Sequence, residues 1–390
     1  MEAIRYCGRQ GRACALARIA ALAALVLALV AAFTLVAAPQ AQAATKASGT
    51  HGGCTWELTS GGTLTIAPTD GESGTLPSSG TNKASARPWY SYRTSIKKVV
   101  FEEGVVTGSS MAYFFYGCTK LTTIEGMENV DASGLYRLGY AFYKCKKLKS
   151  IDFSTWSPSV VYLNWTFAYC TSLKTIDLST FKTKKAERFD HTFYGCSKLE
   201  YADLSTWKTS TVIDFGGMFN GCKKLCYLDI SGWNMKSAIY VGRFVANCTA
   251  LRTFKVGKGY RNNNKNGGGY LYKPKSSKLG TGWWVNGGGK KFTDPTKIPA
   301  KKKAVYTATF KGSTSINKAK VTLKKTSMTY TGSARQCGVK SVKVGGKTLK
   351  KGTDYKVYYS ANVNTGTAKV VIVGCGKYTG SVSKTFKIKK

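Results

Sequence analysis

The chain has 390 residues, 43% of them hydrophobic, and it carries 59 lysines and arginines against 19 aspartates and glutamates. The net charge of +40 at pH 7 excludes a neutral surface and favours polyanionic surroundings such as wall teichoic acids, acidic glycans or nucleic acid. The sequence contains no zinc-finger, helix-turn-helix or RNP motif, which argues against a specific nucleic-acid partner.

Residues 1–43 have the pattern of a secretory signal peptide. Four arginines precede a run rich in Ala, Leu and Val over residues 19–38, and Pro39 and Ala41-Gln42-Ala43 follow it. A basic segment, an apolar run and a small-x-small site predict cleavage after Ala43. The apolar run is also long enough to span a bilayer, so a retained membrane anchor is the alternative. We expect a secreted protein at the cell surface or cell wall.

Residues 44–110 are predicted to form an N-terminal cap for the repeats that follow. Residues 54–58 and 62–66 alternate between polar and apolar side chains, as the two strands of a hairpin do, and residues 96–101 predict a further strand. A stack of repeats needs its first apolar face covered, and this segment stands in the right place to cover it.

One pattern recurs six times within residues 111–256. Its cysteines are 25 to 27 residues apart: Cys118, Cys145, Cys170, Cys196, Cys222 and Cys248. A leucine follows three residues after every one, and other apolar columns flank them. A period of this size indicates stacked units that cannot bury their own apolar faces alone. We therefore predict about six turns, with buried reduced cysteines and one short strand per turn, paired in parallel.

The repeat carries a family resemblance. Phe142-Tyr-Lys-Cys-Lys-Lys-Leu-Lys-Ser-Ile-Asp-Phe-Ser-Thr-Trp156 resembles the BspA-like leucine-rich repeat of bacterial surface proteins, and the match extends over roughly residues 50–310. The resemblance implies a leucine-rich-repeat solenoid, secretion and an adhesive role, with no catalytic residues. This chain has Lys208-Thr-Ser210 where the commoner pattern has Asn and Asp-Thr-Ser, so no ligand is carried over from other members.

Two further segments complete the chain. Residues 257–314 are predicted to form a C-terminal cap and loop, because paired tryptophans at 283 and 284 and an alternating run at 305–310 indicate ordered structure. Residues 315–390 contain short alternating runs between Gly-rich turns, which predict a small β-sandwich. Residues 344–355 and 376–380 resemble the immunoglobulin-like modules of bacterial surface proteins.

The basic tail and its cysteines lead to two more expectations. Residues 301–390 hold 20 lysines and one arginine against Asp354 alone, so we expect the tail to bind anionic cell-wall polymers, with solubility as the simpler role for the charge. The chain shows no lipid-attachment cysteine and no C-terminal sortase signal. Cys337 and Cys375 are the two cysteines of this domain and are predicted to form a disulfide. Cys226 is predicted to face outward as a reactive or pairing thiol.

The sequence shows no clear set of catalytic residues. It contains two histidines, and neither has a marked Ser or Cys partner for a catalytic triad. An aspartate recurs seven residues after each of four cysteines, with a serine two residues further on: Asp152, Asp177, Asp203 and Asp229. This arrangement predicts turn capping rather than a glycosidase pair. We expect no catalytic activity, no cofactor and no metal.

Ligand-binding candidates are the irregular positions of the repeat, because regular columns belong to the scaffold. One such column contains Tyr140, Trp165, His191 and Arg243, and a second contains Lys149, Lys174, Glu200 and Arg252. A solvated face is the simpler interpretation of both columns. The regular aromatic column of Trp156, Phe181, Trp207 and Trp233 is predicted to pack in the core.

These features predict a secreted bacterial surface protein that binds a protein or glycan of a host or neighbouring cell. The alternative is a non-catalytic component that binds or organises extracellular polysaccharide alongside a separate enzyme. The two readings differ in their ligand, which the sequence does not name.

Overall fold

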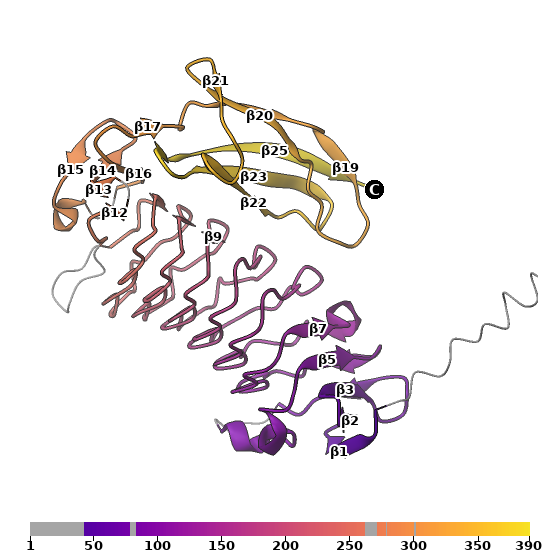
Figure 1. The fold of residues 1–390 in the computed structure, drawn as a ribbon. Coiled ribbons are helices and arrows are strands. Elements are labelled where there is room, and N and C mark those ends of the chain that lie inside the picture. The colour runs from indigo at the N-terminus through magenta and orange to yellow at the C-terminus, as the bar shows by residue number, and fades with distance from the viewer. Residues whose placement is uncertain (1–42, 79–82, 262–270, 278, 300–301) are drawn as a thin grey trace, which may run out of the picture. The chain divides into compact units, whose positions relative to one another are not determined.

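A computed structural model describes residues 43–78, 83–261, 271–277, 279–299 and 302–390 of the chain (Figure 1). The predicted signal peptide therefore lies outside the described residues, apart from its last position. Within the described ranges, no helix is both long enough and apolar enough to cross a bilayer. Thr45–Lys390 forms one compact unit, to which the description below applies.

The N-terminal cap is a sheet that continues directly into the repeats. Its five strands, in spatial order, are β1 (Thr45–His51), β2 (Cys54–Thr59), β3 (Thr63–Pro68), β5 (Lys98–Phe101) and β7 (Thr123–Glu125). The β2–β3 hairpin is antiparallel as predicted, whereas β3, β5 and β7 pair in parallel. Because each apolar residue of β2 and β3 alternates with a more exposed one, the sheet buries one face against the first turn.

Short elements close the loops of this cap. A second parallel sheet contains β4 (Gly74–Thr75), β6 (Val105–Val106) and β8 (Val130–Asp131). Single 3₁₀ turns are formed by η1 (Ala84–Ala86), η2 (Tyr90–Tyr92) and η3 (Met127–Asn129). Trp89, between the first two, is buried and its indole N–H donates to the Phe114 carbonyl at 2.9 Å, which ties the loop to the first turn.

The six turns stack in register through backbone hydrogen bonds. We number them one to six by their cysteines, from Cys118 to Cys248. In turn two, alternate amides donate to carbonyls of turn three, for example Leu138 to Tyr162 at 3.0 Å and Phe142 to Thr166 at 2.9 Å. A parallel bridge also recurs through all the turns: Ser110, Arg137, Tyr162, Arg188, Asp214 and Tyr240. The predicted parallel stacking is confirmed.

The core consists of columns of identical residues. The leucines that follow each cysteine are buried, and the phenylalanines of turns two to five form a stack with centroids 5.4 to 5.5 Å apart. The tryptophans of the predicted core column are buried, and each indole N–H donates to a carbonyl of the preceding turn, as Trp207 does to Leu178 at 3.1 Å. Their packing role is confirmed.

The repeat cysteines are buried and free, as predicted. From Cys145 onward each thiol donates to the carbonyl of the phenylalanine in the preceding turn, at 3.0 to 3.2 Å. Burial raises the pKa of Cys170 to about 12, so this thiol stays protonated at neutral pH. A cysteine fits the column because it is a small apolar side chain with one weak donor to spare.

Regular strands in the repeats are fewer than predicted. The segment after the cysteine forms a strand in turn one, β7, and in turns four to six: β9 (Tyr201–Asp203), β10 (Tyr227–Ile230) and β11 (Thr253–Val256). In turns two and three it forms no strand, and turn three contributes one bridge, Thr175 to Tyr201. The continuous ladder instead runs through the segment ahead of each cysteine. Within that segment the chain also makes a tight turn, because Cys145 N–H donates to the Phe142 carbonyl at 3.1 Å.

The C-terminal cap completes the sheet that begins with β9. Its strands, in spatial order, are β15 (Lys291–Phe292), β14 (Trp283–Asn286) and β16 (Ala304–Thr309), followed by β11, β10 and β9. Because β16 runs antiparallel to β11, it ends the parallel series. Trp284 is buried in the core, in line with the prediction of order around this pair. A hairpin of β12 (Lys275–Ser276) and β13 (Gly280–Thr281) and a 3₁₀ turn, η4 (Pro295–Lys297), complete the cap.

The tail forms two sheets around one core. The strands of the three-stranded sheet are β18 (Lys320–Leu323), β20 (Val339–Val344) and β21 (Lys347–Thr348). Those of the four-stranded sheet are β19 (Ser327–Thr329), β25 (Ser381–Lys389), β23 (Gly366–Gly374) and β22 (Tyr355–Ser360). A short parallel pair, β17 (Thr314–Ser315) and β24 (Tyr378–Thr379), lies beside them. Val321 and Val342 from one sheet and Val370 and Ile372 from the other share a buried cluster.

The predicted disulfide between Cys337 and Cys375 is wrong, since both cysteines are free. Cys337 packs with Ala368 near the start of β23, whereas Cys375 follows the end of that strand and donates to the Thr353 carbonyl. Seven strand residues separate the two environments, or roughly 23 Å. A disulfide requires its Cα atoms within about 7 Å, so the two thiols are too far apart to pair.

The shared core makes one prediction about stability. Leu173→Ala removes a fully buried side chain from the inner column and should lower the free energy of unfolding by about 2–5 kcal/mol. Lys174→Ala, on the exposed neighbour, is the matched control and should change it by less than about 0.5 kcal/mol. Denaturant unfolding of the two variants measures the difference, and equal destabilisation would refute the column assignment.

Candidate functional site

An aromatic ladder lies on the surface of the first four turns. It contains the residue five positions before each cysteine, and its rings stack in parallel: Tyr113 on Tyr140 at 4.7 Å, Tyr140 on Trp165 at 5.9 Å, and Trp165 on His191 at 4.0 Å between centroids. Each of these residues has a left-handed backbone, with φ between 55° and 60°. Such a conformation costs free energy in a non-glycine residue, and offset stacking of the rings recovers part of it.

A second set of aromatic residues flanks the ladder. Tyr116 stacks on Tyr143 with centroids 4.8 Å apart, while Tyr169 and Tyr194 make edge contacts with neighbouring rings. All of them are half-buried, and parallel stacking covers ring faces within the ladder and between Tyr116 and Tyr143. We call these eight residues the aromatic face: Tyr113, Tyr116, Tyr140, Tyr143, Trp165, Tyr169, His191 and Tyr194.

The aromatic face contains three of the predicted ligand candidates, Tyr140, Trp165 and His191. Sequence reasoning missed its five other members, although the tyrosines two residues before a cysteine recur in turns one, two and four. Arg243 belongs to the same column and is exposed, but the column is interrupted at Gly217, which has no side chain to continue the stack. The carboxylate of Asp190, buried beside His191, pairs with Nε of Arg188 at 2.9 Å.

The second predicted ligand column does not form one site. Lys149 and Lys174 are exposed. Arg252, in contrast, donates from its guanidinium to the Leu251 and Lys275 carbonyls and lies over the Phe310 ring, so it holds the C-terminal cap. Glu200, between them in the column, is bound by the tail domain, as described next.

The four-stranded sheet of the tail docks on the repeats through one face of β22 and β23. Because side chains alternate along a strand, Lys356, Tyr358 and Ser360 share this face with Lys369, Val371 and Val373 on the paired strand. Val371 and Val373 are buried in a cluster with Tyr201 and Tyr227 of the repeats. The Tyr358 ring stacks on that of Tyr201, with centroids 4.9 Å apart.

The aspartate column of the repeats serves the docking as well as the turns. One oxygen of each aspartate accepts the amide of the serine two residues on, which confirms the predicted turn caps. The second oxygen of Asp203 accepts from Lys369 Nζ at 2.7 Å, and that of Asp177 accepts the Ala361 amide at 2.8 Å. Lys369 also lies 3.7 Å from Asp229. Sequence reasoning missed this second role.

Charge compensation outweighs burial at Asp203. Burial would raise the pKa of this carboxyl, but Lys369 and two hydrogen bonds from Ser205 hold it below its ordinary value. A carboxyl with a lowered folded-state pKa stabilises the folded state above its unfolded pKa of about 3.9 and loses that contribution as the pH falls through the folded value. The ion pair therefore favours docking at neutral pH.

Cys226 is half-buried against the docked tail, which corrects the expectation of an outward reactive thiol. Its sulfur lies 3.4 Å from the Tyr358 hydroxyl and donates to the Glu200 carbonyl at 3.2 Å. Burial raises its pKa to about 11, which removes the thiolate needed for reactivity at neutral pH. The Tyr358 hydroxyl donates to a Glu200 carboxylate oxygen at 2.9 Å, and Lys356 lies 3.1 Å from the same oxygen.

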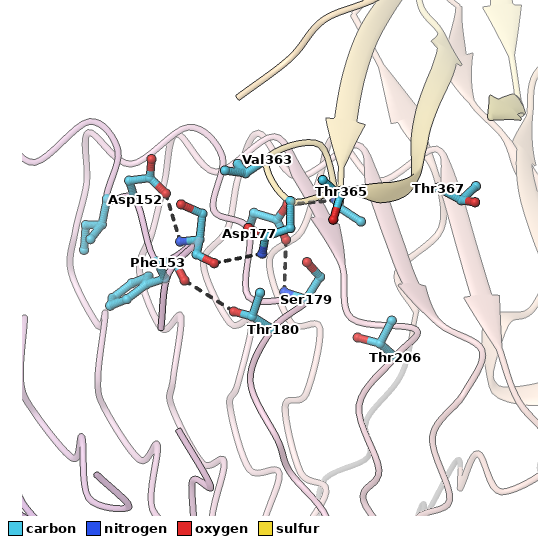
Figure 2. Close-up of a pocket in the computed structure, with 13 residues that line it drawn as sticks. Asp152, Phe153, Asp177, Ser179, Thr180, Thr206, Val363, Thr365 and Thr367 are labelled. Carbon is cyan, nitrogen blue, oxygen red and sulfur yellow. Dashed lines mark hydrogen bonds between the residues drawn. The ribbon is translucent and has the colours of Figure 1, made fainter. Parts of the chain in front are cut away.

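A cavity of about 250 Å³ lies beside this docking surface, where residues 361–367 meet the repeats (Figure 2). Figure 2 shows Asp152, Asp177, Ser179 and Thr180 of the repeats on one side and Val363 and Thr365 on the other. Asn364 donates from its side-chain amide to the Ser154 carbonyl at 2.9 Å, and the Ala361 amide bonds to Asp177, so the loop is attached on both sides of the cavity.

Comparison with known proteins gives a likeness for the repeats. A family model described as "Mycoplasma protein of unknown function, DUF285" matches residues 109–202 and 161–258. A crystal structure of a leucine-rich repeat protein from Eubacterium ventriosum matches 60% of this chain and 98% of its own, with 15% sequence identity and a TM-score of 0.17, too low to support any argument about this chain. No curated protein matches. The repeats are thus similar to a family whose function is itself unknown.

Docking can be followed through the thiol that it covers. Lys369→Gln leaves Asp203 and Asp229 without this cation and should raise the rate of Cys226 alkylation at least tenfold, because the two carboxylates lose a partner that only the docked tail supplies. Lys384→Gln, on an exposed position of β25, is the control. Peptide mass mapping after iodoacetamide treatment identifies the labelled cysteine. Unchanged Cys226 labelling in both Lys369→Gln and Tyr358→Ala would contradict the docking.

Proposed function

We propose that this chain is a secreted bacterial surface protein that binds a protein or glycan of another cell through a leucine-rich-repeat solenoid. In this proposal the six turns are the solenoid, the flanking sheets are its caps and the tail is an immunoglobulin-like module. The parallel hydrogen bonds between turns and the columns of identical core residues support it. The aspartates once considered as catalytic candidates cap turns and hold the tail, which favours a binding role over an enzymatic one.

The aromatic face is the observation that carries the binding role. Eight aromatic residues at adjacent positions, all half-buried, form a large rigid surface with few rotatable bonds, and tyrosine and tryptophan are enriched at binding interfaces for that reason. Stacking within the ladder covers the ring faces, so contacts with a partner would be made through ring edges and polar groups. Such a surface suits hydrogen bonding and edge contacts with a protein partner better than the stacking of sugar rings.

The alternative function is non-catalytic binding or organisation of extracellular polysaccharide. The cavity in Figure 2 favours it, because Ser179, Thr180 and Thr365 bring hydroxyl groups to one small space. The two functions use different surfaces of the chain and can be tested separately.

We also propose that the basic tail retains the protein at the cell wall by binding anionic polymers. Docking engages Lys356 and Lys369, while Lys384, Lys387 and Lys389 of β25 remain exposed. Several exposed lysines on one strand attract a polyanion over a distance that shrinks as salt is added.

Binding through the aromatic face should be lost with its tyrosines. The double variant Tyr116→Ala and Tyr143→Ala should bind at least about tenfold more weakly to the matrix protein that the unaltered protein recognises on extracellular-matrix-protein arrays, and glycan arrays are screened in parallel. Tyr272→Ala, another exposed aromatic residue, is the control. Binding to a matrix protein would favour the adhesin function. Binding to a glycan would favour the polysaccharide-binding alternative. Undiminished binding by the double variant would exclude the aromatic face.

Retention by the tail should depend on salt and on its charge. Washing intact cells with about 1 M salt, where the Debye length falls to about 3 Å, should release the protein. A variant with Lys384, Lys387 and Lys389 changed to Glu should be released at lower salt. The matched control changes the exposed lysines 144, 146 and 147 of the repeats to Glu, which alters the net charge equally. Identical release of the two variants would show that the tail has no special role.

A further inference from the structure

The cavity between the repeats and residues 361–367 is lined by acidic and neutral residues. None of the described residues that line it is a lysine or arginine, although the chain contains 59 of these residues. Sites for phosphate, sulfate or carboxylate groups are built around such cations. Asp152 and Asp177 lie on the wall instead, so the cavity repels anions and is suited to an uncharged ligand.

The lining combines an apolar floor with hydroxyl groups. Ile151 and Val363 contribute a small apolar surface, with 8% of each residue exposed. Ser179 and Thr206 from the repeats and Thr365 from the tail carry hydroxyls, which both donate and accept hydrogen bonds. A pyranose ring has the complementary surface, with C–H groups on its faces and hydroxyl groups around its rim.

Asp152 adds an acceptor to this lining. Its Oδ1 accepts the Ser154 amide at 2.9 Å, while none of the described residues donates to Oδ2. Both oxygens of Asp177, in contrast, are already engaged, by Ser179 and by Ala361. A carboxylate oxygen with spare lone pairs accepts from a sugar hydroxyl, and its charge would reject a carboxylate on the same sugar.

The size of the cavity suits one sugar ring. Drug-sized ligands occupy sites of about 300–1,000 Å³, and this cavity measures about 250 Å³. The Asn364 and Ala361 hydrogen bonds hold the loop against the repeats without a ligand, so little ordering is needed on binding.

We infer that this cavity binds a single uncharged pyranose residue of a glycan, held between hydroxyl groups of the repeats and of the 361–367 loop. The inference deepens the polysaccharide-binding alternative and does not depend on the aromatic face. Thr206 and Thr365 act as hydrogen-bonding partners from the two walls, and Asp152 discriminates against acidic sugars.

The test measures binding of methyl glycosides of glucose, galactose, mannose and N-acetylglucosamine to the whole secreted chain, by saturation-transfer NMR and calorimetry. At least one should bind saturably with a Kd of about 1–10 mM, as expected of one ring. Thr206→Val and Thr365→Val keep the side-chain shape and should each weaken binding about two- to tenfold. Thr385→Val, exposed on β25, is the control and should bind normally.

The charge of the sugar provides a second measurement. A variant that only disturbed the fold would not change the preference between neutral and acidic glycosides. The methyl glycoside of glucuronic acid should bind at least about tenfold more weakly than that of glucose, and Asp152→Asn should narrow this difference. Absence of saturable binding by all four neutral glycosides up to about 100 mM would overturn the inference. So would unchanged binding in both threonine variants, or equal binding of glucuronide and glucoside. The two proposals can fail separately. If a neutral glycoside binds as expected and the Tyr116 and Tyr143 double variant still binds the arrays normally, the cavity is supported and the aromatic face is excluded.

Discussion

The hydrogen bond from one turn to the next is the constraint on which the whole structure depends. A single turn of about 26 residues cannot satisfy its own backbone groups or bury its own leucines, so every amide that points along the stack needs a carbonyl of the neighbouring turn. The tryptophan indoles and the cysteine thiols obey the same rule and donate to carbonyls one turn away. Once this register is set, any residue type repeated at the same position becomes a straight column.

The columns explain how one repeated sequence pattern produces both a buried core and a regular outer surface. A column that points inward becomes core, as the leucines and phenylalanines do, whereas one at the edge becomes a regular array of functional groups. The aspartates form such an array, with one carboxylate oxygen used by the turn and the other left for a partner. The tail binds this aspartate array with alternate residues of β22 and β23. A strand also presents its side chains at a regular spacing, so the two sets can pair.

The sequence was sufficient to predict the features that recur in every turn, but it did not predict the features that occur once. The parallel stacking, the buried cysteines, the indole column and the turn-capping aspartates all recur with one period, so each copy supports the others. Docking of the tail joins Glu200 to Tyr358, 158 residues away, and leaves no period to detect. The disulfide prediction failed because it rested on the number of cysteines in the domain without their positions along β23. The aromatic face was only partly found, because the flanking tyrosine stands two residues before the cysteine in turns one, two and four but one residue before it in turn three, at Tyr169.

The secretion proposed above would make the free thiols important for how the protein matures outside the cell. Secreted chains meet oxidants that join exposed cysteines, whereas each repeat thiol here is protected only while its turn is stacked on the one before. A chain that emerges unfolded presents all of these thiols at once, and any disulfide between turns would block the register that buries them. Stacking therefore has to be completed before oxidation, which favours a chain whose neighbouring turns assemble through local contacts. The cysteine column thus requires the turns to stack faster than their thiols are oxidised. The folded structure contains no disulfide among the described residues.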